Sequence, residues 1–173
     1  MQLGASKDKV GRRSFLGYII AAIGAFVTTV LGSSTAIFAA SPLLTGRRDV
    51  QVPLGAATGF QVGVPKLVQF SLPRKDGWIV EDAAKSVWVV RTGEDKFITY
   101  SPRCTHLGCI VSWVPEQQAF KSPCHGGVFS MEGQVIAGPP PRPLDRLDNR
   151  IEGGKLVVDY KEFRLGIPKK VEA

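Results

Sequence analysis

Two short loops decide the fold of this chain, Cys104-Thr105-His106-Leu107-Gly108-Cys109 and Ser122-Pro123-Cys124-His125-Gly126-Gly127. Together they contain all three cysteines and both histidines of a 173-residue protein, between positions 104 and 125. A random arrangement would scatter these residue types along the chain. The clustering therefore indicates one site that uses sulfur and imidazole as metal ligands.

Two kinds of metal centre fit these residue types. A pair of loops that supplies sulfur to one iron and imidazole to the other can surround a binuclear iron–sulfur cluster. A tetrahedral zinc site made from Cys104, His106, Cys124 and His125 is the alternative, because two cysteines and two histidines are an ordinary zinc set. Structural zinc sites usually separate paired ligands by about two to four residues, whereas here one residue separates Cys104 from His106, and Cys124 and His125 are adjacent. The spacing therefore favours the iron–sulfur centre.

From about residue 50 onward the chain resembles the Rieske iron–sulfur family. The resemblance includes Pro123, the paired glycines that follow His125, and a later Gly138-Pro139-Pro140-Pro141 that is similar to the family's cluster-capping loop. It implies a [2Fe–2S] cluster at the family's four ligand positions, which here are Cys104, His106, Ser122 and His125. It also implies a disulfide between Cys109 and Cys124 that ties the two loops together.

Position 122 departs from the family, which places a cysteine where this chain has Ser122. A serine oxygen is a harder ligand than a thiolate and its proton leaves less readily, so we expect a labile or low-potential centre. Three arrangements remain open. In the first, Ser122 ligates iron. In the second, the cluster is absent and the fold serves as a structural subunit. In the third, Cys124 replaces the missing ligand and leaves Cys109 free.

The resemblance implies an electron-transfer subunit of a bacterial quinol:cytochrome c oxidoreductase. His106 and His125 would be its catalytic imidazoles, where quinol gives up one electron and one proton before the electron passes to a c-type haem. The implied partners are a membrane cytochrome b subunit, a c-type cytochrome and quinol. The small Rieske subunit of an arsenite oxidase is the alternative redox assignment.

Four further residues are expected near the cluster. Leu107 lies where the family uses an apolar residue at the quinone contact, although it equally fits a loop residue that packs inward. Gly138, Pro139 and Pro140 belong to the proline loop, whose rigid backbone would shield the cluster from water.

Two positions bear on the reduction potential. High-potential members of the family have serine and tyrosine hydroxyls at the positions of Gly127 and Phe129, and neither side chain here donates a hydrogen bond. Hydrogen bonds to the sulfurs stabilise the reduced, more negative state. We therefore expect a potential toward the lower end of the family's range of about −150 to +300 mV, which favours menaquinol.

The N-terminal region reads as a membrane anchor. No charged residue occurs between Ser14 and Gly46, and residues 18–40 are a continuous run rich in Ile, Ala, Val, Phe and Gly. At about 1.5 Å per residue, a helix of that length crosses a hydrocarbon core about 30 Å thick. We predict an uncleaved transmembrane signal anchor at 18–40 and a neck at 41–49. A cleaved signal peptide is the alternative, although its apolar region normally has about 7–15 residues.

Flanking charges predict the orientation of this anchor in the bacterial cytoplasmic membrane. Four basic residues precede the apolar run and two follow it: Lys7, Lys9, Arg12, Arg13, Arg47 and Arg48. The excess places residues 1–17 in the cytoplasm and the head outside. Arg12-Arg13-Ser14-Phe15-Leu16 also resembles a twin-arginine export signal, which suits a protein that must cross the membrane already folded around its cluster.

The net charge of +7 does not indicate a nucleic-acid partner. Residues 1–48 carry six Lys and Arg against Asp8 alone, and residues 49–173 carry sixteen against fourteen acidic residues. The basic excess is therefore mostly a signal of membrane topology, without a stripe of arginine and aromatic residues.

Residues 50–173 read as a mainly β head. The better strand candidates are 66–72, 86–92, 97–101, 110–114, 133–137 and 155–160, separated by Gly-rich turns. No long amphipathic helical period is apparent. The pattern predicts an antiparallel β sandwich or barrel that carries the two loops at one end. The resemblance implies that this head is of the Rieske type. Trp78, Trp88 and Trp113 are expected in its core.

Overall fold

The computed structural model describes residues 11–44, 50–76 and 78–173. The chain divides into two compact units, Met1–Arg48 and Asp49–Ala173. Several expected features lie outside the described residues, namely Lys7, Lys9, Arg47, Arg48 and most of the neck.

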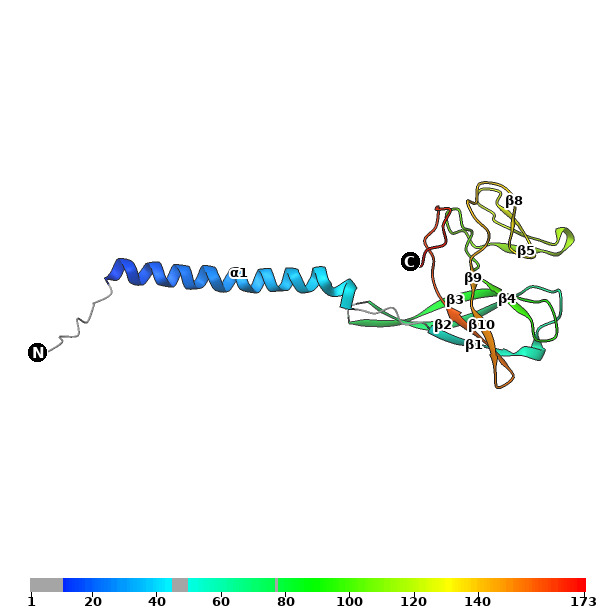
Figure 1. Ribbon diagram of the computed structural model, residues 1–173, viewed down its shortest axis with the longest axis horizontal. Coiled ribbons are helices and arrows are strands. Elements are labelled where there is room, and N and C mark those ends of the chain that lie inside the picture. Colours follow the sequence, from blue (N-terminus) through cyan, green and yellow to red (C-terminus); the bar gives the residue numbers. More distant parts are fainter. Residues whose placement is uncertain (1–10, 45–49, 77) are drawn as a thin grey trace, which may run out of the picture. The chain divides into compact units, whose positions relative to one another are not determined.

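The described part of the first unit forms one helix, α1 (Arg12–Leu44), which is longer at both ends than the expected run 18–40 (Figure 1). It is long and apolar enough to cross a membrane. Its hydroxyl side chains donate hydrogen bonds to backbone carbonyls three or four residues earlier, in Thr28, Thr29, Ser33, Ser34, Thr35 and Ser41. Such bonds satisfy polar groups where water is absent, so these residues are compatible with a membrane span.

The second unit, the head, contains three antiparallel sheets, as the sequence predicted (Figure 1). The first sheet has the order β1 (Val50–Ala56), β11 (Lys155–Tyr160) and β10 (Asn149–Glu152). The second has the order β2 (Lys66–Asp76), β3 (Ile79–Arg91), β4 (Phe97–Tyr100) and β9 (Arg146–Leu147). The third has the order β5 (Ser112–Val114), β6 (Ala119–Lys121), β7 (Val128–Ser130) and β8 (Val135–Ala137). Two short 3₁₀ helices, Ala57–Gly59 and Pro115–Gln117, lie between strands.

The strand β3 joins the two hydrophobic cores of the head. Val87, Trp88, Val89 and Val90 are all buried, although successive side chains of a strand point to opposite faces. Val87 and Val89 belong to a first core that includes residues of β1, β9 and β11. Trp88 and Val90 belong to a second core with residues of β4, β6 and β7. Both faces of the second sheet are therefore covered, which explains why four consecutive residues of β3 are apolar.

Two of the three tryptophans pack in or against the second core, as expected. The indole of Trp88 is buried and donates to the Val111 carbonyl oxygen at 3.1 Å. The rings of Trp88 and Trp113 lie edge-on to Phe120, with centroids 5.3 and 4.9 Å away. The expectation for Trp78 is wrong, because this residue is 94% exposed at the turn between β2 and β3.

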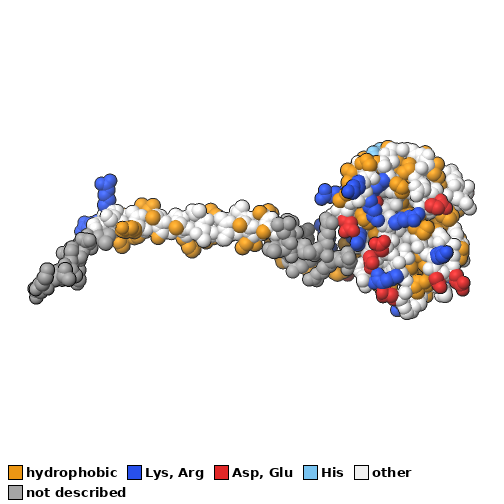
Figure 2. All heavy atoms as spheres, in the orientation of Figure 1, with side chains coloured by type: hydrophobic (Ala, Val, Ile, Leu, Met, Phe, Trp, Pro, Cys, Tyr) orange, Lys and Arg blue, Asp and Glu red, His pale blue; other side chains and the backbone are white. Residues whose placement is uncertain are grey.

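Acidic and basic side chains are interspersed on the visible face of the head (Figure 2). The mixed surface agrees with the small charge excess of residues 49–173.

Replacement of Phe120 tests the second core. Phe120 is fully buried and contacts three aromatic rings, so Phe120→Ala is expected to lower the free energy of unfolding by about 3–5 kcal/mol. Trp78→Ala is the control and is expected to change it by less than about 0.5 kcal/mol. Urea denaturation measures both. Equal effects of the two substitutions would contradict this packing.

Candidate metal centre

Two loops of similar construction lie at one end of the third sheet. Loop 1 (104–109) precedes β5 and loop 2 (122–127) follows β6, and these strands pair with Ser112 opposite Lys121. Each loop is closed by a backbone hydrogen bond between its first and sixth residues, from the Cys104 N–H to the Cys109 oxygen and from the Ser122 N–H to the Gly127 oxygen, both at 2.8 Å. The antiparallel register thus brings together two loops that are far apart in sequence.

A disulfide between Cys109 and Cys124 joins the loops, and Cys104 remains as a free, buried thiol. The site in which Cys124 replaces the missing cluster ligand and the zinc site both require a free thiol at Cys124, and the disulfide leaves none there. Both alternatives are therefore wrong. The remaining thiol belongs to the residue that stands first in loop 1.

The imidazole rings of the two histidines, one from each loop, form a T-shaped contact. The ring centroids of His106 and His125 are 4.9 Å apart and their planes are nearly perpendicular, at 88°. The Nδ1 atom of His106 is buried and has no hydrogen-bond partner, alone among the buried side-chain polar atoms of the described residues. Leaving such an atom unsatisfied costs about 1–3 kcal/mol, so an additional group must be considered at this point.

The proline loop packs directly on loop 2. A Cβ atom added at Gly138 would lie 2.5 Å from the Gly126 carbonyl oxygen, so a side chain at 138 has no room. A Cβ atom added at Gly127 would lie 2.8 Å from Pro140 Cγ and 3.4 Å from the Sγ atom of Cys104. The absence of a side chain at position 127 therefore lets the proline loop, loop 2 and the Cys104 thiol approach one another.

The other candidate residues differ in exposure. Ser122 is buried and stands at the start of loop 2, in the position that corresponds to Cys104 in loop 1. Leu107 is 62% exposed, so the inward-packing interpretation of this residue is wrong. His125 and Pro139 are also exposed, whereas Pro140 is buried. A histidine side chain is visible at the surface of the head near hydrophobic side chains (Figure 2).

These residues suit a binuclear centre better than a single ion. Among the described residues, no three His, Cys, Asp or Glu side chains are placed to hold one metal ion. A [2Fe–2S] cluster needs only two protein ligands on each iron. A buried thiol and an unpartnered imidazole nitrogen from loop 1, with a hydroxyl and an imidazole from loop 2, provide such a set.

Arg142 connects loop 1 to Asp145 and the C-terminal segment, and sequence reasoning missed it. Its guanidinium is buried and donates to both carboxylate oxygens of Asp145, at 3.0 and 2.8 Å. The same group donates to the carbonyl oxygens of Arg164 and Ile167 in the C-terminal segment. The Arg142 carbonyl oxygen in turn accepts a hydrogen bond from the Thr105 hydroxyl at 2.6 Å. An arginine between prolines carries no periodic signal that would have indicated this role.

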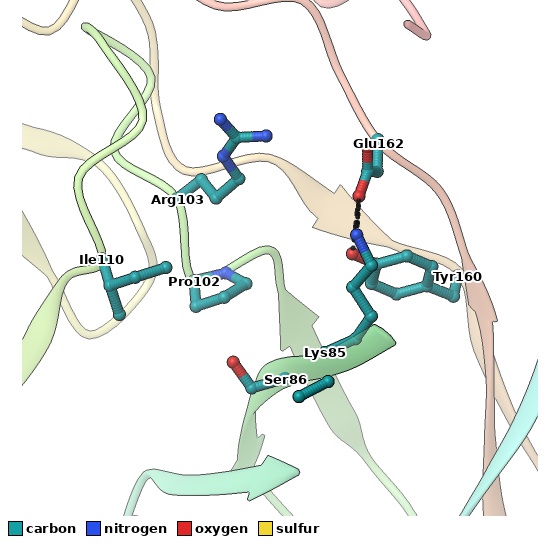
Figure 3. A pocket seen from close by; sticks show the side chains of 8 residues that line it. Lys85, Ser86, Pro102, Arg103, Ile110, Tyr160 and Glu162 are labelled. Atoms are coloured by element: carbon teal, nitrogen blue, oxygen red, sulfur yellow. Dashed lines mark hydrogen bonds and ion pairs between the residues drawn. The ribbon is translucent and has the colours of Figure 1, made fainter. Parts of the chain in front are cut away.

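A hollow beside loop 1 is lined by Arg103, Ile110, Lys85, Tyr160 and Glu162 among others (Figure 3). Its volume of about 230 Å³ lies below the about 300–1,000 Å³ that is typical of ligand pockets. The hydrogen bond from Lys85 Nζ to Glu162 Oε1, at 2.6 Å, lowers the pKa of Glu162. Burial raises the pKa of Tyr160. The hollow is therefore a small site occupied by a local ion pair.

Comparison with known proteins agrees with this geometry. Residues 68–150 match the Rieske [2Fe-2S] domain. The chain is 32% identical over 155 residues to the menaquinol:cytochrome c reductase iron-sulfur subunit of Geobacillus thermodenitrificans, covering 87% of this chain and 92% of that protein. It is 30% identical over 147 residues to the cytochrome b6-f complex iron-sulfur subunit of Chlorobaculum thiosulfatiphilum, covering 85% and 74%. A plasma membrane Rieske protein of Synechocystis PCC 6803 has a TM-score of 0.44 and 27% identity, covering 63% of this chain and 99% of that one.

The antiparallel head and the paired loops define an iron–sulfur protein of the β class. More particularly, the similarity to relatives over most of its length shows that the chain belongs to the Rieske [2Fe–2S] family.

Thiol counting tests the disulfide. In the denatured but unreduced protein, one thiol per chain is expected to react with a thiol reagent, because only Cys104 is free. After reduction all three cysteines are expected to react. Three reactive thiols before reduction would contradict the tie between the loops.

Replacement of Arg142 tests the connection that it makes to loop 1. Arg142→Met is expected to lower the free energy of unfolding by about 3–5 kcal/mol, because it leaves the buried carboxylate of Asp145 unpaired. Lys85→Met breaks a partly exposed ion pair and is expected to cost less than about 1 kcal/mol. Urea denaturation compares the two variants. A smaller loss in Arg142→Met than in Lys85→Met would show that Arg142 does not hold the site together.

Proposed function

We propose that this protein is the electron-transfer subunit of a membrane quinol:cytochrome c oxidoreductase. It would take one electron and one proton from quinol at a [2Fe–2S] centre and pass the electron to a c-type haem. The observation that carries the proposal is the buried, unpartnered Nδ1 atom of His106 beside the ring of His125. The relatives named above, which are reductase and b6-f iron-sulfur subunits, support the same role.

Four side chains would hold the cluster, Cys104 and His106 from loop 1 and Ser122 and His125 from loop 2. A bound [2Fe–2S] cluster supplies one-electron chemistry. Cys104 and Ser122 are buried, which keeps water from the sulfur and oxygen ligands. The burial of His106 Nδ1 makes it the natural ligand atom of that ring.

The surface of the site suits a quinol. The imidazole of His125 is exposed, so a ring nitrogen can accept a hydrogen bond, and then the proton, from a quinol hydroxyl. The exposed side chain of Leu107 offers apolar surface beside the same histidines. Binding and proton acceptance would therefore occur at the outer edge of the two loops.

The residues around the site favour a low potential and hence menaquinol. Gly127 has no side chain and Phe129 has no hydroxyl, so neither donates a hydrogen bond toward the cluster sulfurs. Phe129 is fully buried in the same core as Cys104, so a hydroxyl at this position would be near the ligand loops. Fewer hydrogen bonds leave the reduced state less stabilised.

We further propose that α1 anchors the protein as a single-pass subunit with its head on the outer side of the bacterial cytoplasmic membrane. The basic residues before the apolar run favour a cytoplasmic N-terminus. The disulfide between Cys109 and Cys124 suits an oxidising compartment. A membrane cytochrome b subunit, which forms the quinol pocket, and a c-type cytochrome would be the partners.

A structural subunit without a cluster is the second candidate, because Ser122 replaces the thiolate that the family uses. The disulfide and the second core hold the loops without iron. Iron content separates the two candidates.

Ser122→Cys tests the role of position 122. Because a thiolate is a softer and more readily deprotonated ligand than a hydroxyl, the variant is expected to raise iron occupancy and the midpoint potential. Iron analysis and a redox titration of the full-length protein measure both. An unchanged iron content and spectrum would mean that position 122 does not face the cluster.

Phe129→Tyr tests the missing hydrogen bond. A hydrogen bond to a charged acceptor is worth about 1.5–3 kcal/mol, and part of this acts only on the reduced state. For one electron about 1.4 kcal/mol corresponds to about 59 mV, so an upward shift on the order of 50 mV is expected. Phe163→Tyr, in the first core, is the matched control and is expected to leave the midpoint unchanged. Equal shifts in both variants would contradict the assignment.

A further inference from the structure

The end of the hairpin formed by β2 and β3 presents three apolar side chains to solvent. Trp78 is 94% exposed, Ile79 57% and Val80 66%, and we call these residues the hairpin tip. The hairpin is paired without a break from Lys66 opposite Val89 to Asp76 opposite Ile79. Adjacent exposed apolar side chains at the end of a regular ribbon indicate a contact surface rather than a packing role.

The hairpin tip projects beyond the end of the head at which β1 begins. Val50, the first residue of β1, pairs with Tyr160, whose ring lies 5.4 Å from that of Phe70 in β2. At the other end of β1, Lys66 of β2 lies over the ring of Phe60, 5.4 Å from its centroid. The start of β1 therefore lies near Phe70 of β2, and its end lies near Lys66. The strand β2 continues past Phe70 through six more residues. At about 3.3 Å per residue the hairpin extends about 20 Å past Val50.

The length of chain between α1 and the head limits how far the head can lie from the end of α1. From Leu44, where α1 ends, to Val50 there are six residues, which span about 20 Å at most. The apolar run ends at Ala40, and the last four residues of α1 add about 6 Å. By chain length alone, Val50 can lie at most about 26 Å from the hydrocarbon edge, and the hairpin is long enough to cover most of that distance.

We propose that the hairpin tip, with Trp78 as its anchor, contacts the lipid headgroup interface of the membrane that holds α1. This inference rests on the membrane anchoring in the proposed function and not on the cluster. Tryptophan concentrates at membrane interfaces, because its ring is apolar and its N–H remains in contact with water and headgroups. Ile79 and Val80, the first two residues of β3, add apolar surface next to Trp78.

Lipid fits this surface better than a partner protein does. Three side chains on an isolated turn bury far less than the roughly 1,000 Å² that a specific protein interface requires. A weak lipid contact is sufficient here, because α1 already holds the head at a high effective concentration next to the bilayer. The contact would restrict the orientation of the head relative to the bilayer.

The experiment uses the full-length chain in vesicles of phosphatidylethanolamine and phosphatidylglycerol, with acyl chains brominated near the headgroups. All three tryptophans lie outside α1, so bromine quenching of tryptophan fluorescence reports on the head alone. Emission is expected to fall by up to about one-third, the share of one tryptophan in three, relative to vesicles without bromine. Trp78→Tyr is expected to abolish the difference. Trp113→Phe, in a half-buried residue, is the matched control and is expected to preserve it.

Three results would overturn the proposal. The first is equal emission in both kinds of vesicle, and the second is quenching that persists in Trp78→Tyr. The third is shielding of Trp78 from solvent only when a cytochrome b partner is present. A chain that does not float with the vesicles would overturn the membrane anchor as well. Iron content measured on the same samples reports separately on the electron-transfer role.

Discussion

The Nδ1 atom of His106 is the constraint on which the site depends. Burying an imidazole nitrogen without a hydrogen-bond partner costs about 1–3 kcal/mol, and folded proteins rarely retain such an atom without a use for it. Coordination to iron satisfies the nitrogen lone pair. The centroid of the His125 ring lies 4.9 Å from that of His106, and the buried thiol of Cys104 belongs to the same loop as His106. This arrangement fits the ligand set that we propose for a [2Fe–2S] cluster.

The scaffold that holds this set is made of contacts distant in sequence. The strands that carry loop 2 have only three residues each, too few to fix a loop by themselves. Their stability comes from the second core, where Phe120 and Phe129 pack with Cys104 itself. Arg142 then ties loop 1 to the proline loop and the C-terminal segment. The geometry of the site is therefore inseparable from the packing beneath it.

Much of the fold was predictable, because local chemistry specifies it. The apolar run 18–40 predicted α1, and the turn glycines and β-branched residues predicted β4 and β11. The strands β1, β6, β7, β9 and β10 were missed. The last four have only two to four residues, too few to show a period, whereas β1 has seven but contains Pro53 and Gly55, which are typical of turns. Trp78 was placed in the core because its residue type is usually buried, whereas its position on a turn decides its exposure. Arg142 escaped notice because its partners depend on tertiary structure.

The central claim is that His106, His125 and Cys104 share a binuclear iron centre with the oxygen of Ser122. The most direct test is iron analysis together with the electron paramagnetic resonance spectrum of the reduced, full-length protein from its native membrane. The account predicts about two iron atoms per chain and a signal from a reduced [2Fe–2S] centre with nitrogen ligands. A colourless protein without iron or signal would contradict it.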